Sequence, residues 1–447
     1  MSLTVRQRET LLQDLRQVLS RNHTGHFTKP APHLYPHQWN WDSGFIALGY
    51  ASYAPELAMA ELRALFEGQW QNGMLPHIVF RSRRDDQAVY FPGPDFWQTQ
   101  DLPHGPVGIQ TSGITQPPVH GMVLRRLAEH GQASPELKTF LQEMWPRVVA
   151  LHHYYYRDRN PEGNGLIVIR HPWEAGTDNA PPWDVALARF DPAAVAIPPY
   201  QRLDLVHGKA EHRPTQHDYD YYIHLVDLFR RCGYDEAEMQ RLSPFCMQDP
   251  LFNAVLLRSN DDLIALGEQL GQDVSQLAVY SQQTRHSIDA LLWHEESGLY
   301  HVRNLSTGER LPHRIASGFM PLFAGVPGPE RSRRLLETLK SPAFAGTAEQ
   351  PASWLPTYDL TALDCQPRKY WRGPIWINLN WMLYHGLRRY GYHAEADQLR
   401  DASLQLVQQH GCHEYFYPYA DAAEPRGLGT DAFSWTAALV MDWLQES

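Results

Sequence analysis

The chain contains the stretch Gly373-Pro-Ile-Trp-Ile-Asn-Leu-Asn-Trp381, whose apolar and small residues predict a buried helix. Two similar stretches precede it at intervals of about sixty residues, Asn253-Ala-Val-Leu-Leu257 and Ala316-Ser-Gly-Phe-Met-Pro-Leu322. Each leads to a more polar helix, such as the one predicted for 328–340. Repeated pairs of a buried and an amphipathic helix are typical of a closed double ring of helices. We therefore predict an all-α barrel, with an irregular bundle or an α-solenoid as the alternative.

Hydrophobic periodicity predicts helices along most of the chain. The expected ranges are 5–20, 41–53, 55–70, 116–130, 134–156, 216–231, 250–270, 273–292, 315–324, 328–340, 373–391, 393–410 and 432–444. Strand signals are few and short, at 166–169 and 299–302. The segments 71–114 and 160–214 are rich in Gly and Pro and predict long loops inserted into one domain that spans 1–447.

The composition excludes several classes of protein. Apolar residues make up 43% and charged residues 20%, which is typical of a globular chain. The formal net charge of −11 argues against a nucleic-acid partner, because binding phosphates requires clustered Lys and Arg. No segment has the apolar length of a signal peptide or membrane span. The four cysteines are widely spaced, which predicts neither disulfides nor a zinc ribbon and indicates a cytoplasmic protein.

One stretch predicts a site: His171-Pro-Trp-Glu-Ala-Gly-Thr-Asp-Asn-Ala-Pro-Pro-Trp-Asp184. It places Glu174 and Asp178 between Trp173 and Trp183 on a segment broken by Gly and Pro. A carboxyl group beside indole rings loses hydration, which raises its pKa and allows it to donate a proton near neutral pH. Aromatic faces and carboxylates also bind sugars, so the stretch indicates carbohydrate chemistry. The alternative is a tight turn whose acids cap a helix and whose tryptophans fill the core.

Five further loops combine aromatic and polar residues and run into apolar or Tyr-rich helices. They contain Tyr35-Pro-His-Gln-Trp-Asn-Trp-Asp42, Gln110-Thr-Ser-Gly-Ile-Thr-Gln116, Arg213 with Tyr219, Tyr370-Trp-Arg-Gly-Pro-Ile-Trp376, and His413-Glu414-Tyr-Phe-Tyr-Pro-Tyr419. Single motifs have simpler explanations: Asp42 as a helix cap, or Arg213 in a surface ion pair. In a barrel of paired helices, however, such loops open at the same end and converge on one pocket.

Together these motifs resemble glycoside hydrolase family 63, and most closely its bacterial mannosylglycerate and glucosylglycerate hydrolases. The resemblance rests on Gln38-Trp-Asn-Trp-Asp-Ser-Gly-Phe45, Glu174-Ala-Gly-Thr-Asp-Asn179, Tyr370-Trp-Arg-Gly-Pro-Ile-Trp376, Glu414-Tyr-Phe416 and Phe433-Ser-Trp-Thr-Ala437, and it covers nearly the whole chain. It implies an (α/α)6 barrel with long loops at the active-site end. Ala175 departs from the serine common in the family.

The resemblance also implies roles for individual residues. Asp178, rather than Glu174, corresponds to the general acid of an inverting mechanism, and Glu414 to the general base. The implied sugar subsite consists of Tyr35, Trp39, Trp41, Asp42, Gln116, Trp173, Trp371 and Trp376, and the implied glycerate end consists of Arg213, Tyr219 and Tyr370. No role follows for Arg81, Arg83 and Arg84 in the first long loop.

We therefore expect an inverting α-glycoside hydrolase that cleaves a small, anionic glycoside such as glucosylglycerate or mannosylglycerate. The alternatives are an α-glucosidase or trehalase-like hydrolase of neutral sugars, a sugar epimerase and a non-catalytic sugar-binding protein. No cofactor or metal is expected, since a pair of carboxyl groups suffices for this chemistry and no metal-binding motif is present. The expected partner is a small sugar substrate. The oligomeric state does not follow from the sequence, and a homo-oligomer is one of the alternatives.

Overall fold

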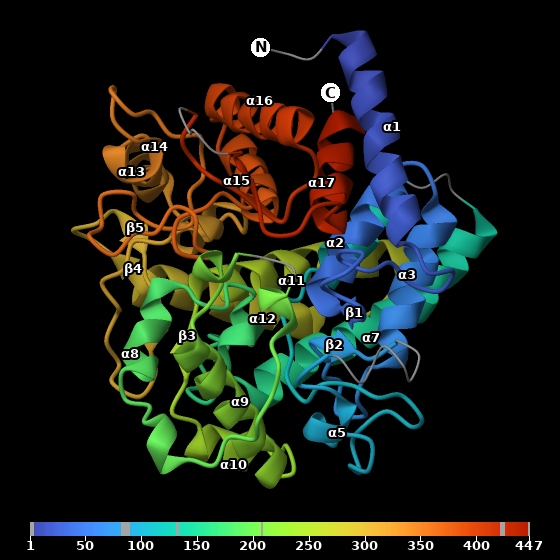
Figure 1. The fold of residues 1–447 in the computed structure, drawn as a ribbon. Coiled ribbons are helices and arrows are strands. Elements are labelled where there is room, and N and C mark those ends of the chain that lie inside the picture. Colours follow the sequence, from blue (N-terminus) through green and yellow to red (C-terminus); the bar gives the residue numbers. More distant parts are fainter. Residues whose placement is uncertain (1–3, 82–89, 131–133, 207–208, 421–424, 446–447) are drawn as a thin grey trace.

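The computed structural model describes residues 4–81, 90–130, 134–206, 209–420 and 425–445, and it is all-α, as predicted (Figure 1). The α-helices are α1 (Val5–Asn22), α2 (Asn40–Ala51), α3 (Pro55–Glu67), α5 (Pro94–Trp97), α6 (His120–His130), α7 (Pro135–Asp158), α8 (Asp184–Leu187), α9 (Gln216–Arg231), α10 (Glu236–Leu242), α11 (Pro250–Leu270), α12 (Ser275–Ser287), α13 (Pro329–Leu339), α14 (Pro342–Ala345), α15 (Ile377–Arg389), α16 (His393–His410) and α17 (Ser434–Gln445).

Short 3₁₀ helices and strands connect these helices. The 3₁₀ helices are η1 (Pro172–Ala175), η2 (Pro181–Trp183), η3 (Pro192–Ala194), η4 (Leu203–Leu205), η5 (Ala210–His212) and η7 (Ala316–Leu322), and η6 (Ile288–Leu292) is a π-helical turn. The strands form four antiparallel pairs: β1 (Gln38–Trp39) with β2 (Ile78–Val79), β3 (Met247–Gln248) with β6 (Arg303–Asn304), β4 (Trp293–His294) with β5 (Leu299–Tyr300), and β7 (Tyr415–Phe416) with β8 (Gly427–Leu428).

Helix boundaries follow from local capping. Ser134 accepts a hydrogen bond from the backbone of α7, with Pro135 at the first helical position. Asp249 caps α11 in the same way, and this helix ends at Gly271, whose φ of 70° closes the last turn. Thr215 forms a capping box at the start of α9. These signals explain why the predicted ranges 216–231 and 250–270 agree with the observed helices.

The inner helices contact one another in chain order. Helix α2 packs against α6, α6 against α11, α11 against η7, η7 against α15, and α15 against α17, which returns to α2. A second set lies outside: α1 packs on α17, α3 on α2, α7 on α6, α12 on α11 and α16 on α15 (Figure 1). The chain therefore alternates between inner and outer helices, which is the arrangement that the repeated pairs predict.

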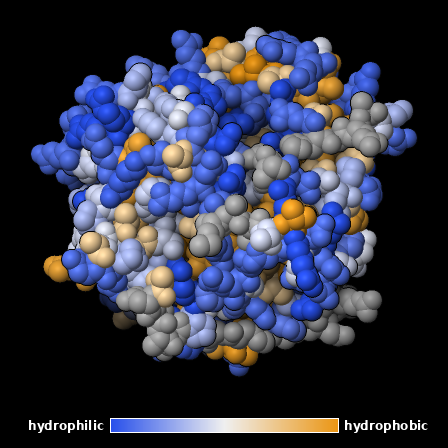
Figure 2. Space-filling view, turned by 90° about the horizontal axis from the view of Figure 1, so that it is seen from above, coloured by the Kyte–Doolittle hydropathy of each residue, from blue (hydrophilic) through white to orange (hydrophobic). Residues whose placement is uncertain are grey.

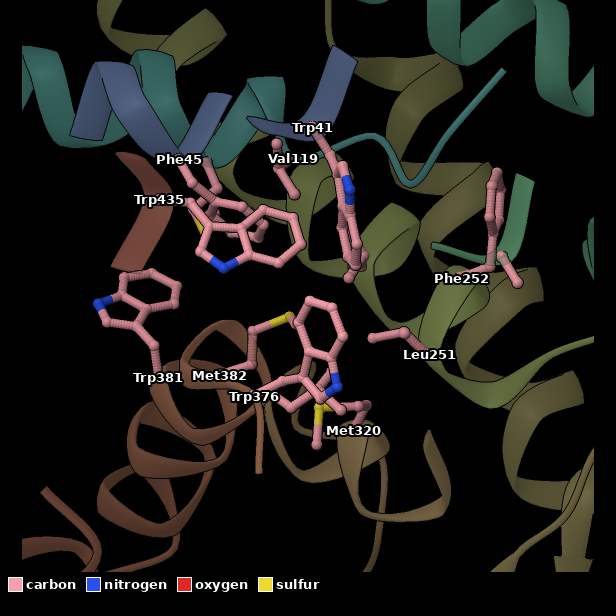
Figure 3. Close-up of a cluster of buried hydrophobic side chains, with 14 of the residues drawn as sticks. Trp41, Phe45, Val119, Leu251, Phe252, Met320, Trp376, Trp381, Met382 and Trp435 are labelled. Atoms are coloured by element: carbon pink, nitrogen blue, oxygen red, sulfur yellow. The ribbon is translucent and has the colours of Figure 1, made fainter. Parts of the chain in front are cut away.

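The centre of the inner set is filled by large apolar side chains (Figure 3). Each of the six inner elements, or the residue just before it, contributes side chains to this cluster. These are Trp41 and Phe45, Val119, Leu251 and Phe252, Met320, Trp376, Trp381 and Met382, and Trp435. Trp41 and Trp435 meet edge to face with ring centroids 5.2 Å apart. Aromatic pairs in this geometry add attraction beyond the burial of area.

Four expectations about secondary structure need correction. Helix α15 begins at Ile377 rather than at Gly373, because the backbone of Ile375 pairs with Phe416 of β7 instead of continuing the helix. Helix α6 begins at His120 rather than at Gln116, because Pro117 and Pro118 lack an N–H and disfavour helical backbone before them. The segment 166–169 forms no strand pair; Ile169 makes a single bridge to Met247. The range 315–324, predicted as a helix, contains the 3₁₀ helix η7, in which Pro321 lies.

The long loops are partly ordered by the barrel. Strand β2, from the segment 71–114, pairs with β1 so that Gln38 lies opposite Val79. The segment 160–214 contains η1 to η5 and α8 rather than continuous loop. One face of the molecule is mostly hydrophilic, with hydrophobic residues only in small groups (Figure 2). Within the described ranges, no helix has the length and apolar character needed to cross a membrane.

Candidate active site

One pocket collects the residues predicted for the site. Its wall contains all thirteen of them: Tyr35, Trp39, Trp41, Asp42, Gln116, Trp173, Asp178, Arg213, Tyr219, Tyr370, Trp371, Trp376 and Glu414. Trp41, Trp376 and Trp435 belong both to this wall and to the apolar cluster of Figure 3. The pocket therefore lies directly on the core, and its aromatic lining is held by close packing.

The first carboxyl group of the pocket is that of Asp178. Burial raises the pKa of Asp178 to about 7, and the negative charge of Glu414 acts in the same direction, against the lowering effect of Arg213. The Tyr370 hydroxyl lies 3.5 Å from Asp178 Oδ2. A carboxyl group with this pKa is partly protonated near neutral pH, as a general acid requires.

The backbone around Asp178 is fixed from three sides. Gly176 has a φ of 72°, and a Cβ atom there would lie 2.5 Å from Trp41 Cζ2, so only glycine permits this close approach. The Tyr222 hydroxyl donates to the Asp178 carbonyl oxygen at 2.8 Å. Asn179 Oδ1 accepts from the backbone N–H of Trp371 at 3.0 Å. These contacts join the loop to α2, α9 and the segment before α15.

The neighbouring Glu174 has a structural role. Its carboxylate is buried and forms a bidentate ion pair with Arg159, at 2.9 and 2.7 Å, outside the pocket. Burial alone would raise the pKa of Glu174, but the charge of Arg159 and the hydrogen bonds to the carboxylate outweigh burial and lower it. Glu174 is therefore ionised and anchors the loop, which distinguishes it from Asp178.

The second carboxyl group, Glu414, lies at the opening of β7 and is almost fully buried. Arg213 donates to it from both terminal nitrogens, at 3.2 Å to Oε1 and 2.7 Å to Oε2. The Tyr35 hydroxyl donates to Oε1 at 2.6 Å, and the Thr430 backbone N–H donates to Oε2 at 3.1 Å. Bidentate pairing with arginine fixes the orientation of the carboxylate.

The position of Arg213 adds to what the sequence predicts. Arg213 lines the pocket together with Tyr219 and Tyr370, and its guanidinium lies 4.9 Å from the centre of the Tyr370 ring. Its strongest contact, however, is the buried ion pair with Glu414. The surface ion pair considered for Arg213 is therefore wrong, and the residue connects Tyr219 and Tyr370 to the second carboxylate.

The residues predicted for the sugar subsite form two groups. Trp371 and Trp376 stack at 3.7 Å between centroids and 7° between planes. On the other side, Gln116 Oε1 accepts from the backbone N–H of Trp41 at 3.3 Å, which orients the side-chain amide. Asp42 follows Trp41, and burial raises its pKa well above the usual value. The N-cap of α2 is Trp39 and Asp42 lies within the first turn of this helix, so the N-cap interpretation of Asp42 is wrong.

Several residues in the pocket wall were not predicted as site residues. They are Leu34, His77, Tyr90, Phe91, Gly176, Arg202, Leu203, Asp204, Pro214, Phe433 and Trp435. Arg202 forms a buried ion pair with Asp204 and lies 3.8 Å from the centre of the Tyr219 ring. Most of these residues come from the two long insertions, whose sequences contain no periodic signal. Only Gly176, Phe433 and Trp435 belong to motifs that indicated a role beforehand.

Arg81, for which the sequence implied no role, does not line the pocket. Arg81 pairs with Glu67 at 2.7 Å, whereas Arg83 and Arg84 fall outside the described residues. Among the residues that the structure describes, no group of three or more His, Cys, Asp or Glu side chains has the arrangement of a metal site.

Comparisons with known proteins show the family of the chain. A family model described as the mannosylglycerate hydrolase MGH1-like glycoside hydrolase domain matches residues 35–436. The chain is 42% identical to a mannosylglycerate hydrolase of Rubrobacter radiotolerans over 98% of this chain and 97% of that protein. It is 34% identical to a glucosylglycerate hydrolase of Mycolicibacterium hassiacum over 96% of both chains.

Solved structures show the same relationship. The structure of a glycoside hydrolase family 63 mannosylglycerate hydrolase from Thermus thermophilus, in complex with Tris and D-glycerate, superposes with a TM-score of 0.89. It is 41% identical and covers 97% of this chain and 99% of its own. Neutral trehalase from Saccharomyces cerevisiae shares the fold alone, with a TM-score of 0.56 and 16% identity over 92% of this chain and 72% of its own.

The helical fold and the aromatic pocket with its carboxyl groups define a glycoside hydrolase. More particularly, the chain belongs to the MGH1-like glycoside hydrolases, with family 63 enzymes among its structural relatives. This membership confirms the resemblance found in the motifs. It also favours hydrolysis over the epimerase and the non-catalytic alternatives.

Proposed function

We propose that this protein hydrolyses mannosylglycerate or glucosylglycerate with inversion at the anomeric carbon. The observation that carries the proposal is the pair of carboxyl groups in one pocket, Asp178 with its pKa raised to about 7 and Glu414 in an ion pair with Arg213. Asp178 donates its proton to the glycosidic oxygen. Glu414 takes a proton from a water molecule that attacks the anomeric carbon from the opposite face.

The aromatic residues form the proposed sugar subsite. The stacked pair of Trp371 and Trp376 and the ring of Trp41 offer flat apolar faces, and the carboxyl of Asp42 accepts hydrogen bonds from sugar hydroxyls. The amide of Gln116 is oriented by its bond to Trp41, so its NH₂ group donates to a hydroxyl. Tyr35, Trp39 and Trp173 complete this subsite.

The glycerate end is assigned to Arg213, Tyr219 and Tyr370. An arginine has five N–H donors, so two hydrogen bonds to Glu414 leave others for the carboxylate of the substrate. Arg213 then holds the general base and the substrate anion at once. The names of the relatives from Rubrobacter radiotolerans and Mycolicibacterium hassiacum support glycerate as the aglycone.

The proposal includes an (α/α)6 barrel, a single domain and a cytoplasmic location. The inner contacts from α2 through α17, with an outer helix beside most inner ones, support an (α/α)6 barrel in which η7 replaces one inner helix. One buried apolar cluster runs from Leu11 to Leu444, which supports a single domain over 1–447. All four cysteines are free thiols, as suits a reducing cytoplasm.

The test is time-resolved proton NMR with α-mannosylglycerate and α-glucosylglycerate in parallel. The expected result is release of glycerate and early appearance of the β-anomer of the free sugar, before mutarotation. The Asp178→Asn protein, which lacks the proposed general acid, serves as the control. Turnover of trehalose or neutral α-glucosides, with none of either glycerate substrate, would establish the alternative hydrolase. Early α-anomer would contradict inversion.

A further inference from the structure

His77 is a polar residue in the pocket wall that the proposed mechanism does not use. It lies just before β2 in the first long segment, lines the pocket and is 5% exposed. Its ring stacks on Trp173 with centroids 5.9 Å apart and planes 17° apart, and meets Trp39 edge-on at 6.4 Å. The imidazole therefore lies between two aromatic residues of the proposed sugar subsite.

The backbone of His77 is held on both sides. Its N–H donates to the Ile114 carbonyl oxygen at 2.7 Å, and its carbonyl oxygen accepts from the N–H of Asn40, the first residue of α2, at 3.0 Å. With ring stacking added, the side chain has little freedom to turn away. A preorganised polar group loses little entropy when a ligand binds.

The hydrogen-bonding capacity of the ring is incompletely used. Neither ring nitrogen of His77 has a hydrogen-bond partner in the described part of the chain, and Nδ1 is fully enclosed, so Nε2 is the nitrogen that a ligand in the pocket can reach. Burial, with a contribution from His171, holds the pKa of His77 well below its ordinary value, so the ring is neutral. A neutral imidazole has one N–H donor and one acceptor nitrogen, which matches a hydroxyl group. Nε2 can therefore donate to, or accept from, a hydroxyl group of a ligand in the pocket.

From this geometry we infer that His77 hydrogen-bonds a ring hydroxyl of the substrate sugar and positions the sugar against Trp173. The inference rests on the proposed function, because it takes the pocket to hold a sugar. Stacking and an unpaired nitrogen in one rigid side chain are the two features that carry it. The buried His152, in contrast, uses both of its ring nitrogens within the core.

The test compares sugars that each lack one hydroxyl. Binding of mannose, glucose and their 2-, 3-, 4- and 6-deoxy forms is measured by calorimetry on the wild-type protein and on His77→Phe, which keeps an aromatic ring beside Trp173. In the wild type, one deoxy sugar is expected to bind about tenfold more weakly than its parent, the loss of one hydrogen bond. In His77→Phe the same deoxy sugar and its parent are expected to bind equally.

His37→Phe is the matched control. His37 stacks beside Trp39 at 6.1 Å and is buried, but it lies outside the pocket wall. The variant is expected to keep the wild-type pattern across the deoxy series. An unchanged pattern in His77→Phe would overturn the role of His77 while leaving hydrolysis intact. A wild-type protein that neither binds these sugars nor cleaves the glycerate substrates would overturn both proposals.

Discussion

At the scale of single residues, the environment gives three acidic side chains of this site different tasks. Asp178 is buried beside the negative charge of Glu414, Glu414 is paired with Arg213, and Glu174 is paired with Arg159 outside the pocket. Asp178→Asn and Glu414→Gln are each expected to lower kcat by about 100-fold or more, because each removes one proton-transfer group. Single-turnover assays on proteins with a cooperative melting transition measure this, and wild-type rates would contradict the roles.

The raised pKa of Asp178 also predicts a dependence on pH. In the proposed mechanism Asp178 must carry a proton, so kcat/KM is expected to fall as the pH rises through about 7. The folded pKa lies above the unfolded value, so the stability that the protonated group contributes is present at low pH and is lost as the pH rises through about 7. Asp178→Asn is therefore expected to be more stable than the wild type at pH 8, by as much as about 4 kcal/mol, and to show little advantage at pH 4. Melting temperatures of the wild type and of Asp178→Asn between pH 4 and pH 8 test this prediction.

Arg213 is expected to affect all substrates, with a further effect on anionic ones. Arg213→Ala leaves the buried carboxylate of Glu414 without its cation, so turnover of a neutral aryl α-glycoside should fall as well. If Arg213 also binds glycerate, kcat/KM for the glycerate substrate should fall about tenfold more. An equal loss on both substrates would restrict Arg213 to holding Glu414.

At the scale of elements, one glycine controls how the acid-bearing loop meets α2. Gly176→Ala would place a methyl group 2.5 Å from Trp41 at a φ of 72°, displacing Asp178 two residues later. We expect kcat to fall about tenfold or more, since small misplacement of a catalytic group is costly. Gly163→Ala is the control: its φ is 66° but nothing lies within 4 Å of the added atom. Equal kcat values in the two variants would contradict the positional argument.

At the scale of the whole molecule, the barrel depends on contact between its first and last inner helices. Gly49 of α2 faces α17, and a Cβ atom there would lie 2.6 Å from the Cα atom of Ala438. Gly49→Ala is expected to destabilise the protein by about 1–3 kcal/mol through overpacking, with a lower melting temperature. Gly328→Ala, where nothing lies within 4 Å, should melt close to the wild type. Calorimetry on both variants checks the closure of the inner helices.

The sequence by itself determined the helical class, most helix ranges and thirteen of the residues that meet in the pocket. Its periodicity, caps and aromatic loops are local signals, and paired helices bring such loops to one end. Only the tertiary structure decided that Glu174 is an anchor, that Arg213 binds Glu414, and that His77 faces the pocket. Burial and ion pairing arise between segments distant in the chain, so no local pattern of residues encodes them.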